Sequence, residues 1–237
     1  MDSTTDLQDR LKLLWQSIES SATKAGRGTA SIRLIPASKG VTPEVLSQAY
    51  EIGLRVFGEN RVQEAREKQP LLPADTEWHF IGGLQRNKAR EAVRLFSLIH
   101  SVDTPELAQE LDRRAGQAVK VQSVLIEVNV GGETTKHGTE PEDAGSLIET
   151  VLKLKHLDLK GFMTVAPYEE DLEKVRPCFT RLRNLRDEME TRYGVSLPEL
   201  SMGMSHDYQV AIEEGATLVR IGTALFGSRK PVFPLAD

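Results

Sequence analysis

Lys39 occupies a position from which a lysine can do covalent chemistry. It closely follows Ile32–Ala37, a short apolar run typical of a strand. A lysine there would project from the end of the strand, where desolvation lowers its pKa and leaves a neutral amine able to form a Schiff base. On position alone, a solvated loop lysine is the alternative interpretation.

Two clusters rich in hydroxyl groups and glycines lie towards the C-terminal end of the chain. They are the segments Ser201–Ser205 and Arg220–Ala224. Hydroxyl groups and glycine amides donate hydrogen bonds to a phosphate dianion, and an arginine offers five N–H donors. Turn glycines and a surface ion pair would explain the same residue types, but two such clusters together favour a phosphate site.

Other polar residues beside apolar runs give weaker signals. Asn60 follows Phe57-Gly58-Glu59 and suits either contact with a planar ring or capping of a helix that begins at Arg61. His79 lies between two aromatic residues, which predicts a packed strand residue rather than a catalytic base. The polar loop Asn129–Gly138 is a candidate lid. No histidine or cysteine spacing suits a metal ion, so no metal site is expected.

The elements around these residues follow a regular alternation. Apolar residues at helical spacing predict an amphipathic helix at about Asp6–Lys24. Beyond it, eight strand patterns alternate with helical patterns, which is typical of a (β/α)8 barrel of the TIM type; a doubly wound open sheet is the alternative. The predicted strands are Ile32–Ala37, Arg55–Phe57, Glu77–Ile81, Leu98–Ser101, Val121–Val130, Leu159–Thr164, Glu199–Gly203 and Leu218–Ile221. The predicted helices between them are Thr42–Glu51, Arg61–Lys68, Gln85–Leu95, Thr104–Gly116, Pro141–Leu154, Asp171–Tyr193 and Asp207–Glu214.

A barrel of this kind would bring the candidate residues to one face. Active sites of such barrels lie at the C-terminal ends of the strands, and the loops after strands seven and eight are a recurrent phosphate site. Lys39 follows the first predicted strand, and the two hydroxyl clusters end the seventh and eighth. The fold therefore predicts one site that combines a lysine with a phosphate-binding region.

Composition narrows the class of protein. The 237 residues show no long linker, so we expect a single domain over residues 1–237. A net charge of −5 argues against binding to nucleic acid through phosphates. One cysteine, Cys178, excludes an intrachain disulfide. There is no signal-like segment near the N-terminus and no run of roughly 20 apolar residues. A soluble cytoplasmic protein with no membrane contact is expected.

Taken together, these segments closely resemble the pyridoxal phosphate homeostasis protein family, also called the proline synthase co-transcribed homologue family. The resemblance spans nearly the whole chain, and its motifs are specific in combination. They are Lys39 after an apolar strand, Phe57-Gly58-Glu59-Asn60 with Gln63-Glu64, Trp78-His79-Phe80-Ile81-Gly82 with Leu84-Gln85 and Asn87-Lys88, Leu200–Ser205 and Arg220–Gly227.

The resemblance implies the barrel of fold-type III pyridoxal phosphate proteins, as in the N-terminal domain of alanine racemase. It implies that Lys39 carries the cofactor as an internal Schiff base, that Arg220 faces the pyridine nitrogen and that Asn60 neighbours the ring. The residues that it assigns to the phosphate cradle are Ser201, Ser205, Gly222 and Thr223. It also implies a cytoplasmic monomer without established enzymatic turnover.

Two functions follow from a lysine beside a phosphate site. One is a pyridoxal phosphate reservoir or carrier in vitamin B6 homeostasis, with transient contacts to apo-enzymes. The other is an enzyme, either an amino-acid racemase using the same cofactor or a Schiff-base aldolase. A racemase needs acid–base groups on both faces of the substrate carbon; neither Tyr168 nor Tyr208 suits the second face, and the short segment after the last strand leaves no room for a second domain. An arginine at the ring nitrogen weakens the ring as an electron sink. We therefore expect binding with little or no turnover.

Overall fold

The computed structural model describes residues 3–132 and 137–227, in which eight parallel strands form one sheet of order β1-β8-β7-β6-β5-β4-β3-β2. The sheet curls into a nearly closed barrel, because Ala37 and Gly58 form a bridge between β1 and β2, and the Ser38 amide donates to the Gly58 carbonyl at 2.8 Å. The strands are β1 (Arg33–Pro36), β2 (Val56–Glu59), β3 (Glu77–Phe80), β4 (Leu98–Val102), β5 (Gln122–Glu127), β6 (Leu157–Met163), β7 (Glu199–Met204) and β8 (Leu218–Ile221). The predicted (β/α)8 barrel is confirmed, and the open sheet is excluded.

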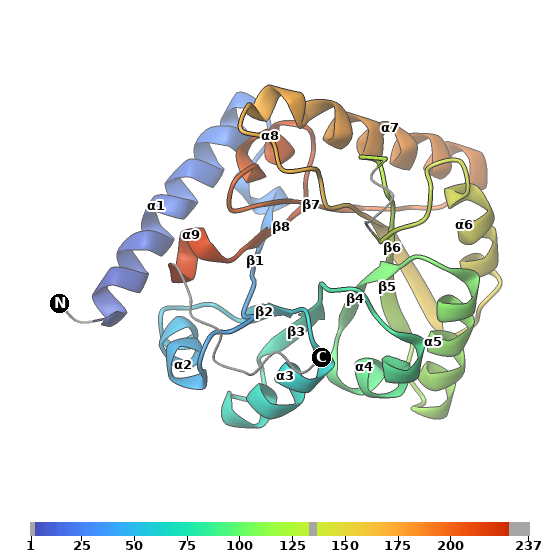
Figure 1. Cartoon of the computed structure of the whole chain (residues 1–237), viewed down its shortest axis with the longest axis horizontal. Coiled ribbons are helices and arrows are strands. Elements are labelled where there is room, and N and C mark those ends of the chain that lie inside the picture. The colour runs from blue at the N-terminus through green and yellow to red at the C-terminus, as the bar shows by residue number, and fades with distance from the viewer. Residues whose placement is uncertain (1–2, 133–136, 228–237) are drawn as a thin grey trace.

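Helices surround the strands on the outside of the barrel (Figure 1). They are α1 (Ser3–Lys24), α2 (Pro43–Glu51), α3 (Val62–Lys68), α4 (Ala89–Leu95), α5 (Pro105–Gln117), α6 (Ala144–Leu152), α7 (Arg176–Tyr193), α8 (Tyr208–Glu213) and α9 (Thr223–Phe226). The extra N-terminal helix α1 packs beside α8, where Lys24 forms an ion pair with Glu213 and the Tyr208 hydroxyl donates to Ser17 Oγ at 2.8 Å.

Several predicted boundaries differ from the structure by a few residues, and two of these differences have a clear cause. Strand β5 ends at Glu127 instead of Val130, because Val128 makes only a single bridge, to Thr139. Helix α7 begins at Arg176 instead of Asp171, since a short 3-10 turn, Leu172–Lys174, precedes it.

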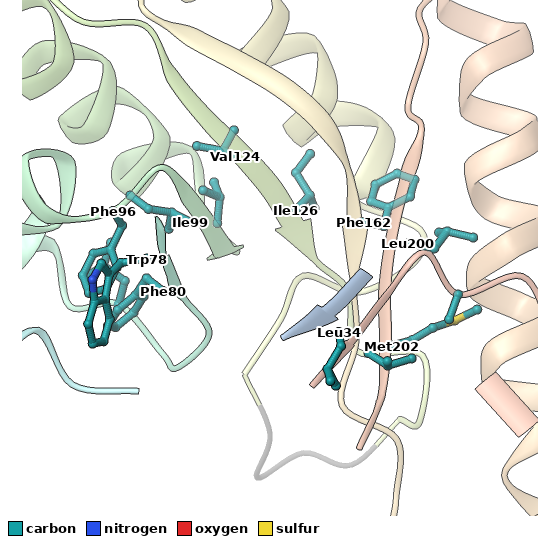
Figure 2. Packing of buried hydrophobic residues seen from close by; sticks show 14 of the residues in the cluster. Leu34, Trp78, Phe80, Phe96, Ile99, Val124, Ile126, Phe162, Leu200 and Met202 are labelled. Atoms are coloured by element: carbon teal, nitrogen blue, oxygen red, sulfur yellow. The ribbon is translucent and has the colours of Figure 1, made fainter. Parts of the chain in front are cut away.

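Alternate residues of the strands build two separate apolar layers. Leu34, Val124, Ile126, Phe162 and Leu200 belong to the large core between the sheet and the helices (Figure 2). Their direct neighbours along the strands face the inside of the barrel, because successive side chains of a strand point to opposite faces. The apolar side chains inside the barrel form a second, smaller cluster, which consists of Ile35, Ile81, Leu98, Leu125, Met163 and Leu218. Burial of a whole apolar side chain such as Phe162 contributes about 1.5–3 kcal/mol to the stability of the folded protein.

Candidate functional site

The C-terminal ends of β1 and β8 lie side by side, which places Lys39 beside the second hydroxyl cluster. Pro36 pairs with Ile221, and the Ala37 amide donates to the Ile221 carbonyl at 2.8 Å. Lys39 and Gly222 therefore follow adjacent strands at the same end of the barrel. The structure thus brings the first and the last candidate segments together.

Lys39 itself is exposed, so the prediction that its amine is desolvated is wrong for this structure. The buried position in the turn belongs to Ser38, whose hydroxyl donates to Glu59 Oε1 at 2.7 Å. Because Ser38 takes the inward direction, the next side chain is left on the solvent side of the barrel mouth.

The loops after β7 and β8 meet at Ser205. The Ser205 Oγ accepts hydrogen bonds from the backbone amides of Gly222 (3.1 Å) and Ala224 (3.2 Å). Thr223, between those two amides, is exposed, whereas Ser205 and Gly222 are half-buried. Three of the four residues assigned to the phosphate cradle therefore form one cluster at the mouth.

Arg220 is buried inside the barrel and is not part of a surface ion pair. Its Nη1 donates to the carbonyl and the hydroxyl of Ser201 at 2.7 and 2.6 Å, and its Nη2 donates to the Thr164 carbonyl at 2.7 Å. Burial lowers the pKa of Arg220 to about 10, so the guanidinium stays charged near neutral pH. These bonds use three of its five N–H groups, leaving two for other acceptors.

Ser201, the fourth predicted cradle residue, lies in a different network from Ser205. Its Oγ is 2.9 Å from His100 Nδ1, His100 Nε2 is 3.1 Å from His79 Nδ1, and His79 Nε2 is 3.0 Å from Glu77 Oε1. This hydrogen-bonded chain crosses the barrel interior from β7 to β3. His79 is buried in its strand, as predicted, and its part in the chain was not foreseen.

The ends of this chain fix the direction of every hydrogen bond in it. Arg220 can only donate, and Glu77 remains an acceptor because the hydrogen bond from His79 holds the pKa of its carboxyl at about 2. Burial lowers the pKa of both His79 and His100, so each ring is neutral and carries one proton. The Ser201 hydroxyl must therefore donate to His100. Its proton is engaged inside the barrel.

Asn60 follows β2 and lies against the loop after β3. A Cβ atom at Gly82 would lie 2.4 Å from the Asn60 carbonyl oxygen, so only glycine permits this close approach. The residue at the N-terminal cap of α3 is Arg61, with no side-chain capping bond. Helix capping by Asn60 is therefore excluded, and contact with a planar ring stays a prediction.

Two acidic residues at the mouth were missed from the sequence. Asp103 follows β4, and Glu127 is the last residue of β5. Burial raises the pKa of Glu127 to about 7, with the Asp103 carboxylate adding to the rise and the Arg220 guanidinium opposing it. Glu127 Oε2 is buried without a hydrogen-bond partner in the described part of the chain. Glu127 would have been placed at the end of a strand had β5 not been extended to Val130, and Asp103 is the first residue after β4.

We expect Glu127→Gln to stabilise the protein in a pH-dependent way. Burial raises the pKa of Glu127 from 4.5 to about 7. The unfolding free energy of the protein therefore falls by up to about 3 kcal/mol as the pH rises from about 4.5 through 7 and the buried carboxyl ionises. A glutamine removes this loss. The unfolding free energy of the variant should exceed that of the parent by about 2 kcal/mol at pH 8 and by less than about 1 kcal/mol at pH 5. Equal gains at both pH values would contradict the assignment.

Other candidates are less well placed for chemistry. The Tyr208 hydroxyl is bound to Ser17 on α1, and Tyr168 is exposed with its ring stacked on His206 at 4.8 Å. The candidate lid falls partly outside the described residues, which omit 133–136 and with them Lys136. A Cβ atom at Gly83 would lie 3.2 Å from the His137 ring, so His137, near the end of that loop, lies against the loop after β3.

Two further features are absent from the described residues. No three of their histidine, cysteine, aspartate or glutamate side chains are grouped so that they could hold a metal ion. Among the helices of that same portion, none combines the length and the apolar character needed to cross a membrane.

Comparison with known proteins places the chain in a family. Residues 37–230 match the family model of the alanine racemase N-terminal domain. A curated pyridoxal phosphate homeostasis protein from Aquifex aeolicus is 53% identical over 223 residues, covering 94% of this chain and 98% of the relative. A protein of the same name from Vibrio cholerae is 38% identical over 230 residues, with 94% and 96% covered.

Solved structures agree with this placement. PipY from Synechococcus elongatus, in a structure with pyridoxal phosphate bound, has a TM-score of 0.82 and 36% identity and covers 93% of this chain and 100% of that one. An alanine racemase from Clostridium difficile shares the fold, with a TM-score of 0.70 and 16% identity over 93% of this chain and 56% of the racemase. The chain therefore belongs to the pyridoxal phosphate homeostasis protein family, built on the barrel of the alanine racemase N-terminal domain.

Proposed function

We propose that this protein binds pyridoxal phosphate as a Schiff base on Lys39 and serves vitamin B6 homeostasis with little or no catalytic turnover. The observation that carries the proposal is the arrangement at the barrel mouth. The exposed Lys39 follows β1, the hydroxyl-and-amide cluster follows the adjacent strands β7 and β8, and the buried Arg220 cation lies next to the last residue of β8. The names of the relatives and the ligand of PipY agree with it.

Lys39 has the chemistry for the covalent link. Its amine would hold the cofactor by adding to the aldehyde carbon, with loss of one water molecule and formation of a C=N bond. Its exposed position gives the aldehyde access from solvent.

Ser205, Gly222 and Thr223 suit the phosphate. A serine hydroxyl has two acceptor lone pairs and one proton. The amides of Gly222 and Ala224 occupy the Ser205 lone pairs, and the Ser205 proton has no acceptor within the described residues. That proton and the exposed Thr223 hydroxyl are thus available to phosphate oxygens. We assign Ser201 a supporting role, in which it holds the Arg220 guanidinium, because its own proton is engaged by His100.

Arg220 and Asn60 suit the ring. The N–H groups of Arg220 that have no acceptor among the described residues would donate to an unprotonated pyridine nitrogen. A ring held in that form is a poor electron sink for carbanion chemistry. Asn60 follows β2, which neighbours β1 at the seam of the barrel, and supplies a planar amide there. These assignments favour storage of the cofactor over its use.

Glu127 is the one observation that favours a second candidate, an amino-acid racemase or a Schiff-base aldolase. Its pKa of about 7 suits general acid–base catalysis. A racemase, however, needs such groups on both faces of the substrate. Tyr168 and Tyr208 are engaged elsewhere, so low turnover remains the proposal.

The remaining assignments complete the proposal. The chain acts as a single domain over residues 1–237 and as a cytoplasmic monomer, whose barrel mouth stays open for transient contact with apo-enzymes. A net charge of −5 and a single cysteine agree with a protein that holds a small molecule in a reducing compartment.

Titration of the double variant Ser205→Ala/Thr223→Ala with pyridoxal phosphate tests the phosphate assignment. Each charge-assisted bond contributes about 1.5–3 kcal/mol, so the dissociation constant should rise by one to two decades or more. The matched control is Ser31→Ala/Thr191→Ala, which removes the same groups from exposed sites on the outside of the barrel. If affinity were unchanged in the first variant, the phosphate would have to bind elsewhere.

A further inference from the structure

Lys39 lies on a tight turn whose conformation is specified by its neighbours. The Val41 amide donates to the Ser38 carbonyl at 2.9 Å, which closes a four-residue turn with Lys39 and Gly40 at its centre. Gly40 has a φ of +67°, the left-handed conformation that glycine adopts without strain. The direction in which the Lys39 side chain leaves the backbone therefore depends on this turn.

A buried ionic cluster, formed by Glu59, Glu64 and Lys68, holds the turn on both sides of Lys39. Lys68 Nζ donates to the Ser38 carbonyl at 2.8 Å, to Glu59 Oε1 at 2.6 Å and to Glu64 Oε2 at 2.9 Å. Glu64 Oε2 in turn accepts the Gly40 amide at 3.0 Å. The backbone before Lys39 is thus bonded to Lys68, and the backbone after it to Glu64.

A contribution to the stability of the fold does not by itself explain this buried ionic cluster. Lys68 and Glu59 are fully buried and Glu64 nearly so. Taking three charges out of water costs several kcal/mol each, and apolar residues of similar volume usually serve a core as well. The cluster also separates the two lysines chemically. All three N–H groups of the Lys68 ammonium have acceptors in the cluster or at Ser38, so Lys68 is held away from the barrel mouth and Lys39 is the candidate nucleophile.

We propose that Lys68 and Glu64 are positioning residues for Lys39, which hold its turn so that the amine meets the aldehyde of the cofactor. The inference rests on the proposed function, because it concerns how the same lysine is aimed. It assigns to these residues no contact with the cofactor.

Glu64→Leu against Glu64→Gln is the matched test. The leucine removes the acceptor of the Gly40 amide and leaves Lys68 paired with Glu59, so the buried cation keeps one acidic partner. The glutamine keeps an acceptor oxygen. We expect Glu64→Leu to lower the equilibrium constant for Schiff-base formation with pyridoxal phosphate about tenfold, the effect of one hydrogen bond. Glu64→Gln should stay within about threefold of the parent.

Pyridoxine 5′-phosphate separates positioning from general damage, because it has a hydroxymethyl group in place of the aldehyde. Its affinity should change less than about twofold in Glu64→Leu. Lys68→Met/Glu59→Gln/Glu64→Gln, which removes the contact with Ser38 without leaving either partner acid charged, should show the same split. Equal losses for both ligands, or Schiff-base formation as in the parent, would overturn the inference.

Hydrogen exchange in the cofactor-free protein gives a readout independent of the cofactor. The Gly40 amide should exchange at least about tenfold faster in Glu64→Leu than in the parent and in Glu64→Gln. Unchanged exchange would show that Glu64 does not hold the turn. If the parent itself formed no Schiff base, the proposed function would fail. The exchange experiment would still test whether Glu64 holds the turn that carries Lys39.

Discussion

Lys39→Ala is expected to give a folded protein that forms no covalent adduct with pyridoxal phosphate. The visible absorption band of the Schiff base should be absent, and borohydride should leave no cofactor on the chain. Affinity should fall by about a hundredfold or more, equivalent to about 2.7 kcal/mol, because only phosphate and ring contacts remain. Lys39 is exposed, so the unfolding free energy should change by less than about 0.5 kcal/mol.

Lys155→Ala is the matched control for this variant. Lys155 is also exposed, but it precedes β6 and so lies at the opposite end of the barrel. This variant should bind and be trapped like the parent. Peptide mapping that found the reduced adduct mainly on another lysine, Lys68 included, would refute the assignment of Lys39.

Arg220→Met is expected to destabilise the barrel by about 3–5 kcal/mol. The substitution removes the donor of the Thr164 carbonyl and one of the two donors of the Ser201 carbonyl, which keeps the Thr164 amide. It also leaves Glu127 buried without the guanidinium that lowers its pKa. Each unsatisfied buried group costs about 1–3 kcal/mol, and an uncompensated buried charge costs more. Denaturant unfolding at pH 6 and pH 8 measures the loss, which should be larger at pH 8.

The double variant Arg220→Met/Glu127→Gln isolates the charge effect. Removing the acid removes the uncompensated charge, so the double variant should recover at least about 1 kcal/mol relative to Arg220→Met at pH 8. Strict additivity of the two substitutions, or no loss of stability in Arg220→Met, would show that Arg220 and Glu127 are not coupled through the barrel interior.

The barrel could be predicted from sequence because its signals are local. Each strand is a short apolar run, and proline after threonine marks the start of helices such as α2 and α5. The C-terminal ends of the strands then follow from the fold class, which is why Lys39 and Ser205 could be placed on one face. The ends of the strands were predicted less reliably. Val128 is an apolar residue of the kind that strands favour, but it lies beyond the end of β5 and makes a single bridge to Thr139.

The contacts inside the barrel could not be predicted because they depend on packing between distant segments. Ser201 and His100 are 101 residues apart in the chain, and the hydrogen bond between them exists only once the barrel closes. Lys68 has the pattern of an ordinary helix-terminal lysine, yet it is fully buried against the turn that carries Lys39. The exposure of Lys39 also depends on contacts between distant segments, because Ser38 points inward and donates to Glu59 on the neighbouring strand.

The measurement that tests the central claim most directly is steady-state turnover of the cofactor-loaded protein on a panel of D- and L-amino acids. The same preparation should be tested for transfer of pyridoxal phosphate to an apo-enzyme. We predict stoichiometric binding, measurable transfer and no racemase, transaminase or decarboxylase activity at an ordinary enzymatic rate, roughly 1 s⁻¹. Turnover at or above that rate which disappeared in Lys39→Ala would contradict the account.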